Sequence, residues 1–246
     1  MKRLATGTLT LALAALASTA LAAQQRPPAA PAAQDSRPGL AVLDFDIGAT
    51  IGQDPDDYQA LRRGLASMTL SELTANNSIR VVERAQLQQI MQEQNLGREG
   101  RVDPSTVSQI GRLIGAKYMV TGTLYDVRGD VRVDARLFDT ETGQILRSYR
   151  VSGRLDNVFD LVTQLSTQLL ANQSLPPLQR GAMEEHRQAN PAPPTQAVMA
   201  YSRAVLYADR GDNDRAVEQY RRALQVFPAY TQAKTDCNRL QAGACT

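Results

Sequence analysis

Three consecutive strand patterns, separated by two tight turns, occupy residues 118–155 and limit the available folds more than any other feature of this chain. The turns lie at residues 128–130 and 140–143, and each contains a glycine, as is typical of short hairpin connections. In the middle segment, apolar side chains at positions 131, 133, 135 and 137 alternate with mostly polar ones. A period of two is typical of a strand with one face on a core. The three segments therefore predict an antiparallel meander.

Ahead of the meander, strand and helix patterns alternate. Residues 40–45 form a continuous apolar run, which is typical of a central strand buried on both faces. A second strand is predicted at residues 79–82. Helices are predicted over residues 54–73, 85–94, 103–115 and 156–169. The pattern predicts an α+β fold, a two-layer α/β sandwich with a mixed sheet that ends in the meander and helices on one sheet face.

The N-terminal residues predict the compartment to which the protein is exported. A basic start at Lys2 and Arg3 precedes an apolar run and the small residues 20–22, which together are typical of a cleaved secretory signal over residues 1–22. The run is shorter than the roughly 20 residues that span a bilayer, so no membrane span is expected. No cysteine lies near the cleavage site, so a lipid anchor is not expected there. We expect a periplasmic protein, with outer-membrane association left open.

Composition divides the rest of the chain. Residues 23–38 are rich in proline and alanine and predict a disordered tether. The α/β domain is expected over residues 39–174, a polar linker over 175–194 and a helical unit over 195–246. Without Lys2 and Arg3, basic and acidic residues are equal in number at 25 each. This balance argues against nucleic acid as a partner.

The helical unit has the pattern of a tetratricopeptide repeat. Small and large residues recur over about 34 positions, as that repeat requires. A third helix is expected after residue 230. One repeat buries too little surface to be stable alone, so it should pack on the α/β domain or on another subunit. The predicted packing residues are Ala204, Tyr207, Gly211, Ala216, Tyr220, Ala223 and Pro228.

Two cysteines, Cys237 and Cys245, are the only ones in the chain. An oxidising periplasm permits them to pair across a short C-terminal loop. The alternative is that Cys237 packs as a small apolar residue while Cys245 stays free in a frayed tail. Both interpretations remain open from the sequence.

Residues suited to catalysis or cofactor binding are few. His186 is the only histidine, so a zinc site or a histidine-based relay cannot be assembled from the usual parts, and we interpret it as a solvated linker residue. Gly97 and Gly100 fit no phosphate-binding loop. Asp44 with Asp46, and the group Asp54, Asp56 and Asp57, could hold a cation or act as an acid–base pair, but turns and helix N-termini explain them better. We expect no enzyme activity, cofactor or metal.

Four arginines on the predicted meander could form a binding surface. Arg132, Arg136, Arg147 and Arg150 could form a patch for an anionic partner on one sheet face. Asp134 lies among them, and the balanced charge of the chain favours a mixed, solvated face instead.

The order of elements resembles one family. Residues 81–84 lead into a helix with Leu87, Ile90 and Met91, a second helix ends at Gly115, and a strand and the turn at residues 139–143 follow. This order is similar to the periplasmic α/β domain of the curli production assembly/transport component (CsgG) family. The resemblance implies an envelope protein with protein partners, and homo-oligomers formed through the α/β domain.

The resemblance is incomplete at the places that make a pore. Channel-forming members insert two membrane-spanning hairpins into the domain, and each spanning strand needs about 9–11 residues. Here the first insertion point is the tight turn at residues 128–130, and residues 153–156 pass directly from strand to helix. The chain therefore resembles the α/β domain without the pore hairpins.

Two function classes are expected, with a third behind them. The first is a non-catalytic assembly or scaffolding protein that binds protein partners through its α/β domain and its repeat. The second is a periplasmic ring subunit of a secretion pore. The third is a regulator of a cell-wall synthase, because lipoprotein activators of such enzymes have a similar α/β fold.

Overall fold

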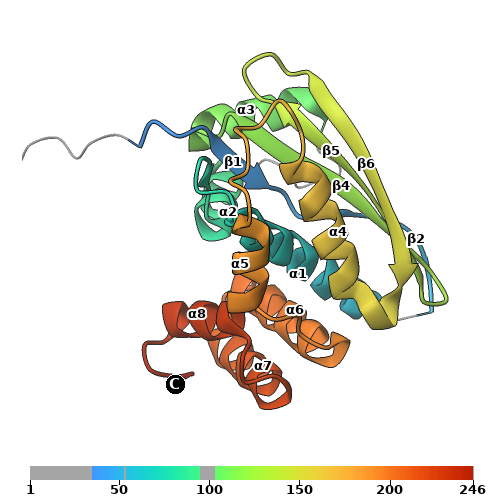
Figure 1. Ribbon diagram of the computed structural model, residues 1–246. Helices are drawn as coiled ribbons and strands as arrows, with labels where there is room; N and C mark the ends of the chain where they lie inside the picture. The colour runs from blue at the N-terminus through green and yellow to red at the C-terminus, as the bar shows by residue number, and fades with distance from the viewer. Residues whose placement is uncertain (1–34, 53, 95–102, 246) are drawn as a thin grey trace, which may run out of the picture. The chain divides into compact units, whose positions relative to one another are not determined.

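The computed structural model describes residues 35–52, 54–94 and 103–245 (Figure 1). The predicted signal, most of the tether, Gly97 and Gly100 lie outside these ranges. Residues 35–246 group into one compact unit. Its strands are β1 Gly39–Val42, β2 Asp46–Ile51, β3 Arg80–Val81, β4 Tyr118–Val127, β5 Asp130–Asp139 and β6 Ile145–Arg154. Its helices are α1 Pro55–Leu73, α2 Arg84–Glu93, α3 Pro104–Ile114, α4 Val158–Leu170, α5 Ala182–Ala189, α6 Thr195–Asp209, α7 Asn213–Val226 and α8 Thr231–Leu240, with a short 3-10 turn η1 Leu155–Asn157 before α4.

The strands form one mixed sheet in the order β3-β1-β4-β5-β6, with β2 also paired to β4. β1 runs parallel to both β3 and β4, whereas β4, β5 and β6 are antiparallel neighbours. The predicted α+β class, the mixed sheet and the C-terminal meander are confirmed. A tight turn joins β4 to β5 with positive φ at both Arg128 (56°) and Gly129 (85°), the geometry that two-residue hairpins favour.

The apolar run at residues 40–45 is a strand only as far as Val42. β1 ends at Val42, and β2 begins at Asp46 on the same side of β4, further along it. Phe45 lies between them and is fully buried. A β-carbon at Gly122 would overlap the ring of Phe45, so the glycine of β4 makes room for it.

Helices cover both faces of the sheet at one end. The larger core packs α1 and α4 against residues such as Leu40, Val120 and Leu137. A second core on the opposite face packs α2 and α3 against Ala41, Met119 and other side chains of β1, β4 and β5. The sequence analysis expected helices on one sheet face only. Local periodicity identifies the apolar side of α2 and α3, but the sheet face on which these helices pack depends on tertiary contacts. Phe138, expected on the solvated face, is buried there.

The helical unit packs on the α/β domain of its own chain, mainly through α6 and α1 (Figure 1). The contact is close, because a β-carbon on Gly64 of α1 would lie 2.7 Å from the β-carbon of Ser202 on α6. Of the two arrangements left open by the sequence, the structure has the intramolecular one. No helix among the described residues is long and apolar enough to cross a membrane.

Candidate functional site

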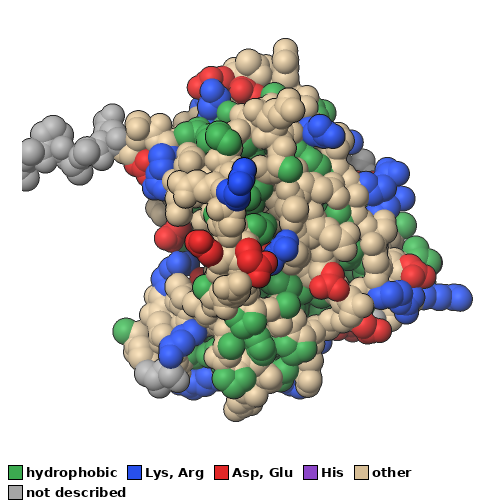
Figure 2. All heavy atoms as spheres, viewed as in Figure 1, with side chains coloured by type: hydrophobic (Ala, Val, Ile, Leu, Met, Phe, Trp, Pro, Cys, Tyr) green, Lys and Arg blue, Asp and Glu red, His purple; other side chains and the backbone are tan. Residues whose placement is uncertain are grey.

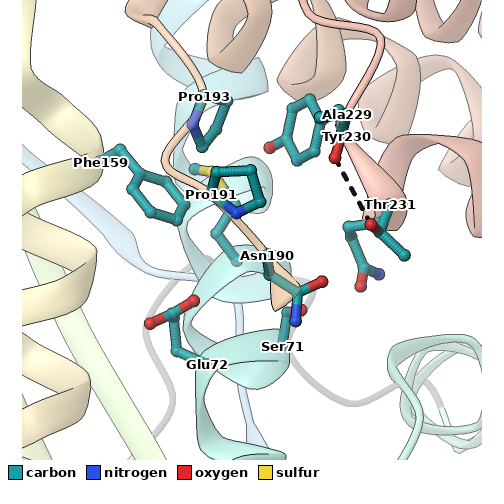
Figure 3. A pocket seen from close by; sticks show the side chains of 11 residues that line it. Ser71, Glu72, Phe159, Asn190, Pro191, Pro193, Ala229, Tyr230 and Thr231 are labelled. Carbon is teal, nitrogen blue, oxygen red and sulfur yellow. Dashed lines mark hydrogen bonds between the residues drawn. The ribbon is translucent and has the colours of Figure 1, made fainter. Parts of the chain in front are cut away.

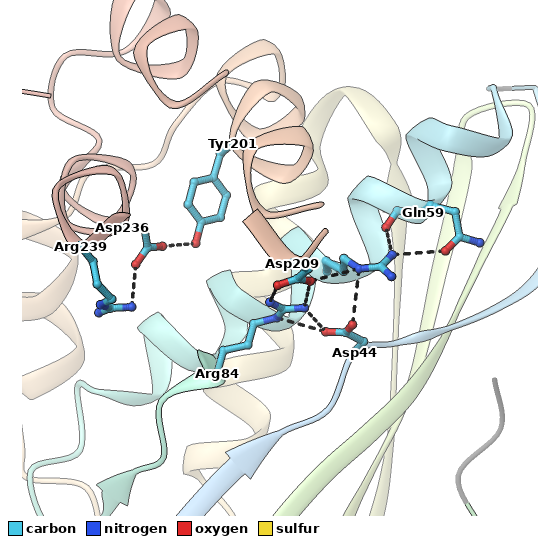
Figure 4. A network of polar contacts seen from close by, with 8 residues as sticks. Asp44, Gln59, Arg84, Tyr201, Asp209, Asp236 and Arg239 are labelled. Carbon is cyan, nitrogen blue, oxygen red and sulfur yellow. Dashed lines mark hydrogen bonds and ion pairs between the residues drawn. The ribbon is translucent and has the colours of Figure 1, made fainter. Parts of the chain in front are cut away.

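A partly buried ion-pair network joins the helical unit to the α/β domain (Figure 4). Arg84, the first residue of α2, donates to both carboxylate oxygens of Asp209, at 2.5 and 2.6 Å. The same guanidinium donates to Asp44 at 2.8 and 3.1 Å. Asp44 follows β1 and Asp209 ends α6, so one arginine connects a strand, a sheet-covering helix and the repeat. Bidentate arginine–carboxylate pairs are among the strongest polar contacts in proteins.

Arg63 of α1 completes this network. Its Nε lies 3.2 Å from Asp209 and 3.7 Å from Asp44, and its Nη1 donates to the carbonyl oxygen of Gln59 at 2.7 Å. Desolvation lowers the pKa of Arg63. For Arg84, desolvation acts in the same direction, but the charges and hydrogen bonds of Asp44 and Asp209 outweigh it and raise its pKa. The positive charges of two arginines thus equal the negative charges of two aspartates at the junction.

A tyrosine cluster fills the core of the helical unit. Tyr201 is fully buried, and its ring lies 5.8 Å from that of Tyr220 and 5.1 Å from that of Tyr230. Its hydroxyl donates to Asp236 of α8 at 2.8 Å. Burial raises the pKa of all three tyrosines, so the phenols are neutral at physiological pH. Burial also raises the pKa of Asp236, against the opposing effect of the Tyr201 hydrogen bond.

The predicted packing residues divide into three groups. Ala204, Ala216, Tyr220 and Ala223 are all buried, as the predicted helix pair requires. Tyr207 is only partly buried, with the guanidinium of Arg215 stacked 4.7 Å from its ring centre. Tyr201 fills the gap between the helices that the sequence analysis assigned to Tyr207. Gly211 and Pro228 lie in the turns that follow α6 and α7.

The two cysteines are joined as a disulfide in the structure, between α8 and the C-terminal tail. Both are buried, at 0% and 4% exposure. Asn238 reinforces the same loop, because its side chain exchanges two hydrogen bonds of 3.1 Å with the backbone of Cys245.

The interpretation of His186 as a solvated residue is wrong. Its side chain is only 11% exposed, and Nε2 lies 3.3 Å from Oε1 of the buried Glu72 on α1. The start of the predicted linker is also fixed on the domain: the Tyr118 hydroxyl donates to the carbonyl oxygen of Ser174, just before the linker, at 2.6 Å, and Asn76 donates to that of Pro176 at 2.8 Å. These partners lie 56 to 114 residues apart, so no local pattern could have shown them.

The acidic residues considered for chemistry have structural partners. Asp54 caps α1 by accepting from the backbone N–H of Asp56 at 2.8 Å, and Asp57 accepts from Arg203 of α6 at 2.7 Å. Asp103 caps α3 as predicted, and Gly115 ends that helix in a left-handed conformation. Within the part of the chain that the structure describes, no group of three or more candidate ligands could hold a metal ion.

The predicted arginine patch forms a mixed face on the sheet. Asp134 accepts from Arg150 at 2.8 Å and lies 3.4 Å from Arg132, whose guanidinium stacks over Tyr125 at 4.3 Å. Arg147 is opposite Leu137 in the β5–β6 register and so belongs to the other face. This face is polar and partly neutralised, as the interpretation of a solvated face predicts.

A small pocket opens where the two parts of the chain meet (Figure 3). It has room for about 20 Å³ and is lined by α1, α4, the connector before α6 and the turn into α8. Hydrophobic side chains gather on one face of the helical unit (Figure 2). Several residues of the connector before α6 and of the turn into α8 are exposed, among them Pro191, Ala192, Pro228 and Ala229. We call these four residues the apolar rim.

Residues 18–129 match the family described as curli production assembly/transport component CsgG. No curated protein matches the chain. Among solved structures, it is similar to the LpoB C-terminal domain from Salmonella enterica, with 18% identity over 48% of this chain and 83% of that one (TM-score 0.36). It is also similar to lipoprotein GNA1162 from Neisseria meningitidis, with 16% identity over 55% and 97% (TM-score 0.39), and to a PelC dodecamer from Paraburkholderia phytofirmans, with 18% identity over 55% and 89% (TM-score 0.29).

The family match ends at the turn between β4 and β5, so it spans β1 to β4 and helices α1 to α3. The match includes α2, α3 and β4, whose order pointed to the family in the sequence, but not the turn at residues 139–143. Over residues 18–129 the chain is therefore similar to the curli production assembly/transport component CsgG family.

Proposed function

We propose that this protein is a non-catalytic scaffold of the periplasm and outer envelope, and that it binds protein partners on the helical side of the junction. The CsgG family is non-catalytic and associated with the cell envelope, which supports the general class. The observation that carries the proposal is the junction itself. Arg84, Arg63 and the Gly64–Ser202 contact hold the helical unit against the domain.

A fixed junction favours a binding role. Ordering two loosely tethered parts on a partner would cost conformational entropy, whereas a preorganised surface avoids most of that cost. Two residues of the apolar rim, Pro191 and Ala229, line the pocket where the two parts of the chain meet, and apolar side chains bordered by polar ones are common at protein–protein interfaces.

Photo-crosslinking in living cells tests this proposal. A photoreactive residue at Ala192 or Ala229, both exposed on the apolar rim, should form an adduct with the same envelope protein. A residue at Arg222, exposed on α7, serves as the control. Ala229→Asp should remove the adduct formed from position 192. Adducts that are equal at all three positions, or that persist in Ala229→Asp, would contradict a partner on this surface.

The second candidate, a periplasmic ring subunit, is favoured by the open edges of the sheet. Among the described residues, β6 pairs only with β5 and β3 pairs only with β1, so their outer backbone groups can pair with another copy. Light scattering on the purified chain distinguishes the two candidates. A defined oligomer that Ser148→Pro on β6 converts to monomers supports the ring, because proline removes a backbone donor.

A further inference from the structure

Strand β6 forms one edge of the sheet (Figure 1). Among the described residues it pairs only with β5. Just beyond β6, the backbone N–H of Leu155 donates to the carbonyl oxygen of Gly129, in the turn that leads into β5, at 2.9 Å. Because backbone groups alternate in direction along an antiparallel pair, those of Ser148, Arg150 and Ser152 point away from β5. These outward donors and acceptors make β6 an open edge.

The other open edges of the sheet are poorer acceptors. β3 consists of two residues, and the pairing of β2 with β4 shifts register between Ile47 and Thr50. Short strands and bulges are devices by which proteins prevent edge-to-edge pairing. In contrast, β6 keeps a regular register with β5 from Arg147 to Arg154. This regular stretch is as long as an ordinary strand, so a whole strand can align on it.

The charge of β6 selects among the possible occupants of this edge. Its only charged residues are Arg147, Arg150 and Arg154, and all three are exposed. Asp134 and Asp130 of β5 lie opposite the last two and pair with them at 2.8 Å. Arg147 has no ion pair within the described ranges. Because β5 and β6 together carry five arginines and three aspartates, the edge keeps an excess of positive charge.

A second copy of β6 does not suit this edge. Antiparallel pairing of two copies would place the arginines of one beside those of the other, and like charges on neighbouring strands are destabilising. An acidic strand meets complementary charge instead. The side chain of Arg150 is 67% exposed, so it can donate to a second carboxylate while it holds Asp134. Arg84 bridges two aspartates in the same way at the junction.

We propose that β6 accepts an extended, acidic segment of a protein partner as an additional strand of the sheet. Backbone hydrogen bonds with Ser148, Arg150 and Ser152 hold the segment. Its carboxylates recur at every second position and lie beside Arg150 and Arg154, which share one sheet face. A shallow hollow lined by residues 130–132 and 152–154 lies at the end of this edge and receives a side chain of the added strand.

This surface is separate from the apolar rim. The inference therefore goes beyond the scaffold proposal, and either can fail while the other stands. The ring candidate would use the same edge for a second copy of the chain, so the oligomeric state is measured beside peptide binding.

Two peptides test the site on the whole purified chain. The probe is acetyl-Thr-Glu-Val-Glu-Val-Glu-Thr-amide, and the control peptide replaces each glutamate with glutamine. The acidic peptide should bind saturably and more tightly than the control, and the difference should shrink as the salt concentration rises.

Amide hydrogen exchange distinguishes strand addition from simple attraction between charges. With the acidic peptide bound, the outward N–H groups of Ser148, Arg150 and Ser152 should exchange about tenfold more slowly or slower still. The N–H groups of Tyr149 and Val151 point toward β5, so their exchange should change little.

Variants locate the binding. Ser148→Pro removes one outward donor and no bond to β5, and it should weaken peptide binding up to about tenfold. Arg150→Gln should weaken it about two- to fivefold, as for the loss of an exposed ion pair. Arg222→Gln, exposed on α7, controls for the loss of one positive charge and should bind as the parent does. If the proline variant fails to fold, Arg150→Gln and the exchange rates of the parent decide the question.

Several outcomes overturn the proposal. Absence of saturable binding means that the arginines only protect the edge from pairing. Equal binding of both peptides means that charge does not select the occupant. Binding without slower exchange on β6, or undiminished binding in both Ser148→Pro and Arg150→Gln, places the peptide elsewhere. A stable oligomer that Ser148→Pro dissociates, seen by light scattering, assigns the edge to a second copy.

Discussion

Gly64 determines how closely α1 and α6 approach. Any larger residue at that position would place a β-carbon 2.7 Å from that of Ser202 and 3.0 Å from its α-carbon, distances that well-packed atoms do not tolerate. A glycine within a helix normally costs about 1 kcal/mol relative to alanine. Its presence on the inner face of α1 is therefore explained by the packing of the helical unit.

Gly64→Ala should destabilise the protein by about 1–3 kcal/mol, because overpacking at the contact outweighs the gain in helix propensity. Ser202→Gly in the same chain moves the missing β-carbon to the other helix and should restore part of the loss. Chemical denaturation of the two single variants and the double variant measures the coupling. Additive effects would contradict a direct contact between these residues.

The raised pKa of Asp236 predicts that the stability of the protein depends on pH. Burial raises its folded-state pKa above the ordinary value of 3.8, so the folded protein favours the protonated acid. Its stabilising contribution is therefore fully present below pH 3.8 and is lost as pH rises through the folded pKa. Each unit of the shift corresponds to about 1.4 kcal/mol.

Asp236→Asn keeps an oxygen that can accept from Tyr201 but cannot ionise. The stability of this variant relative to the parent should therefore increase between pH 4 and pH 7. Urea denaturation at several pH values measures the difference. A difference that is constant with pH would show that Asp236 ionises as easily in the folded as in the unfolded chain.

At the scale of the elements, the short helix α2 helps to hold α6 in position. Only Leu87 is buried along this ten-residue helix, yet its first residue joins α6 to the end of β1. Burying an ion pair gains little over apolar packing, but removing one partner from it costs about 3–5 kcal/mol. The network thus makes the position of α6 sensitive to a side chain of α2.

Arg84→Ala should leave Asp44 and Asp209 with Arg63 as their one remaining cation in the network and destabilise the junction by about 3–5 kcal/mol. Arg84→Lys, which keeps the charge but loses the forked geometry, should cost less. Thermal melting gives the order of the three proteins, and limited proteolysis shows whether the connector before α6 is cut first. Equal melting temperatures for Arg84→Ala and the parent would contradict a structural role for the network.

Local sequence patterns predicted most of the elements but few of their contacts. The caps at Asp103 and Gly115 follow from the preferences of single residues, and the meander follows from alternation. The Arg84–Asp209 pair joins residues 125 positions apart, and His186 meets Glu72 across 114. Such contacts depend on how elements dock, and no periodicity encodes that. The same reason explains why Tyr207 was favoured over Tyr201, because both lie in one helix and only the packing of α8 distinguishes them.

At the scale of the whole molecule, the C-terminal tail is held by Cys237 and Cys245, which are eight positions apart. Closing a loop of this size lowers the entropy of the unfolded chain and stabilises the fold by about 2–3 kcal/mol in the chain-entropy estimate.

We predict that the pair is oxidised in protein exported to the periplasm. Thiol titration of freshly isolated, denatured protein should find no reactive thiol before reduction and two after it. Reduction should also lower the midpoint of denaturation. Two reactive thiols in unreduced material would leave Cys237 as a buried apolar residue, the alternative that the sequence left open.

The close contact of α1 with α6 affects where a domain boundary can be placed in this chain. A single helical repeat normally depends on a neighbouring repeat to cover its inner face. Here α1, which also covers the sheet, occupies that place, so one continuous core extends from the sheet past α1 into the repeat. A domain boundary placed in the connector before α6 would separate the repeat from α1, the helix that covers its inner face. The unit that evolution could transplant as a whole therefore includes α1, and with it the sheet domain.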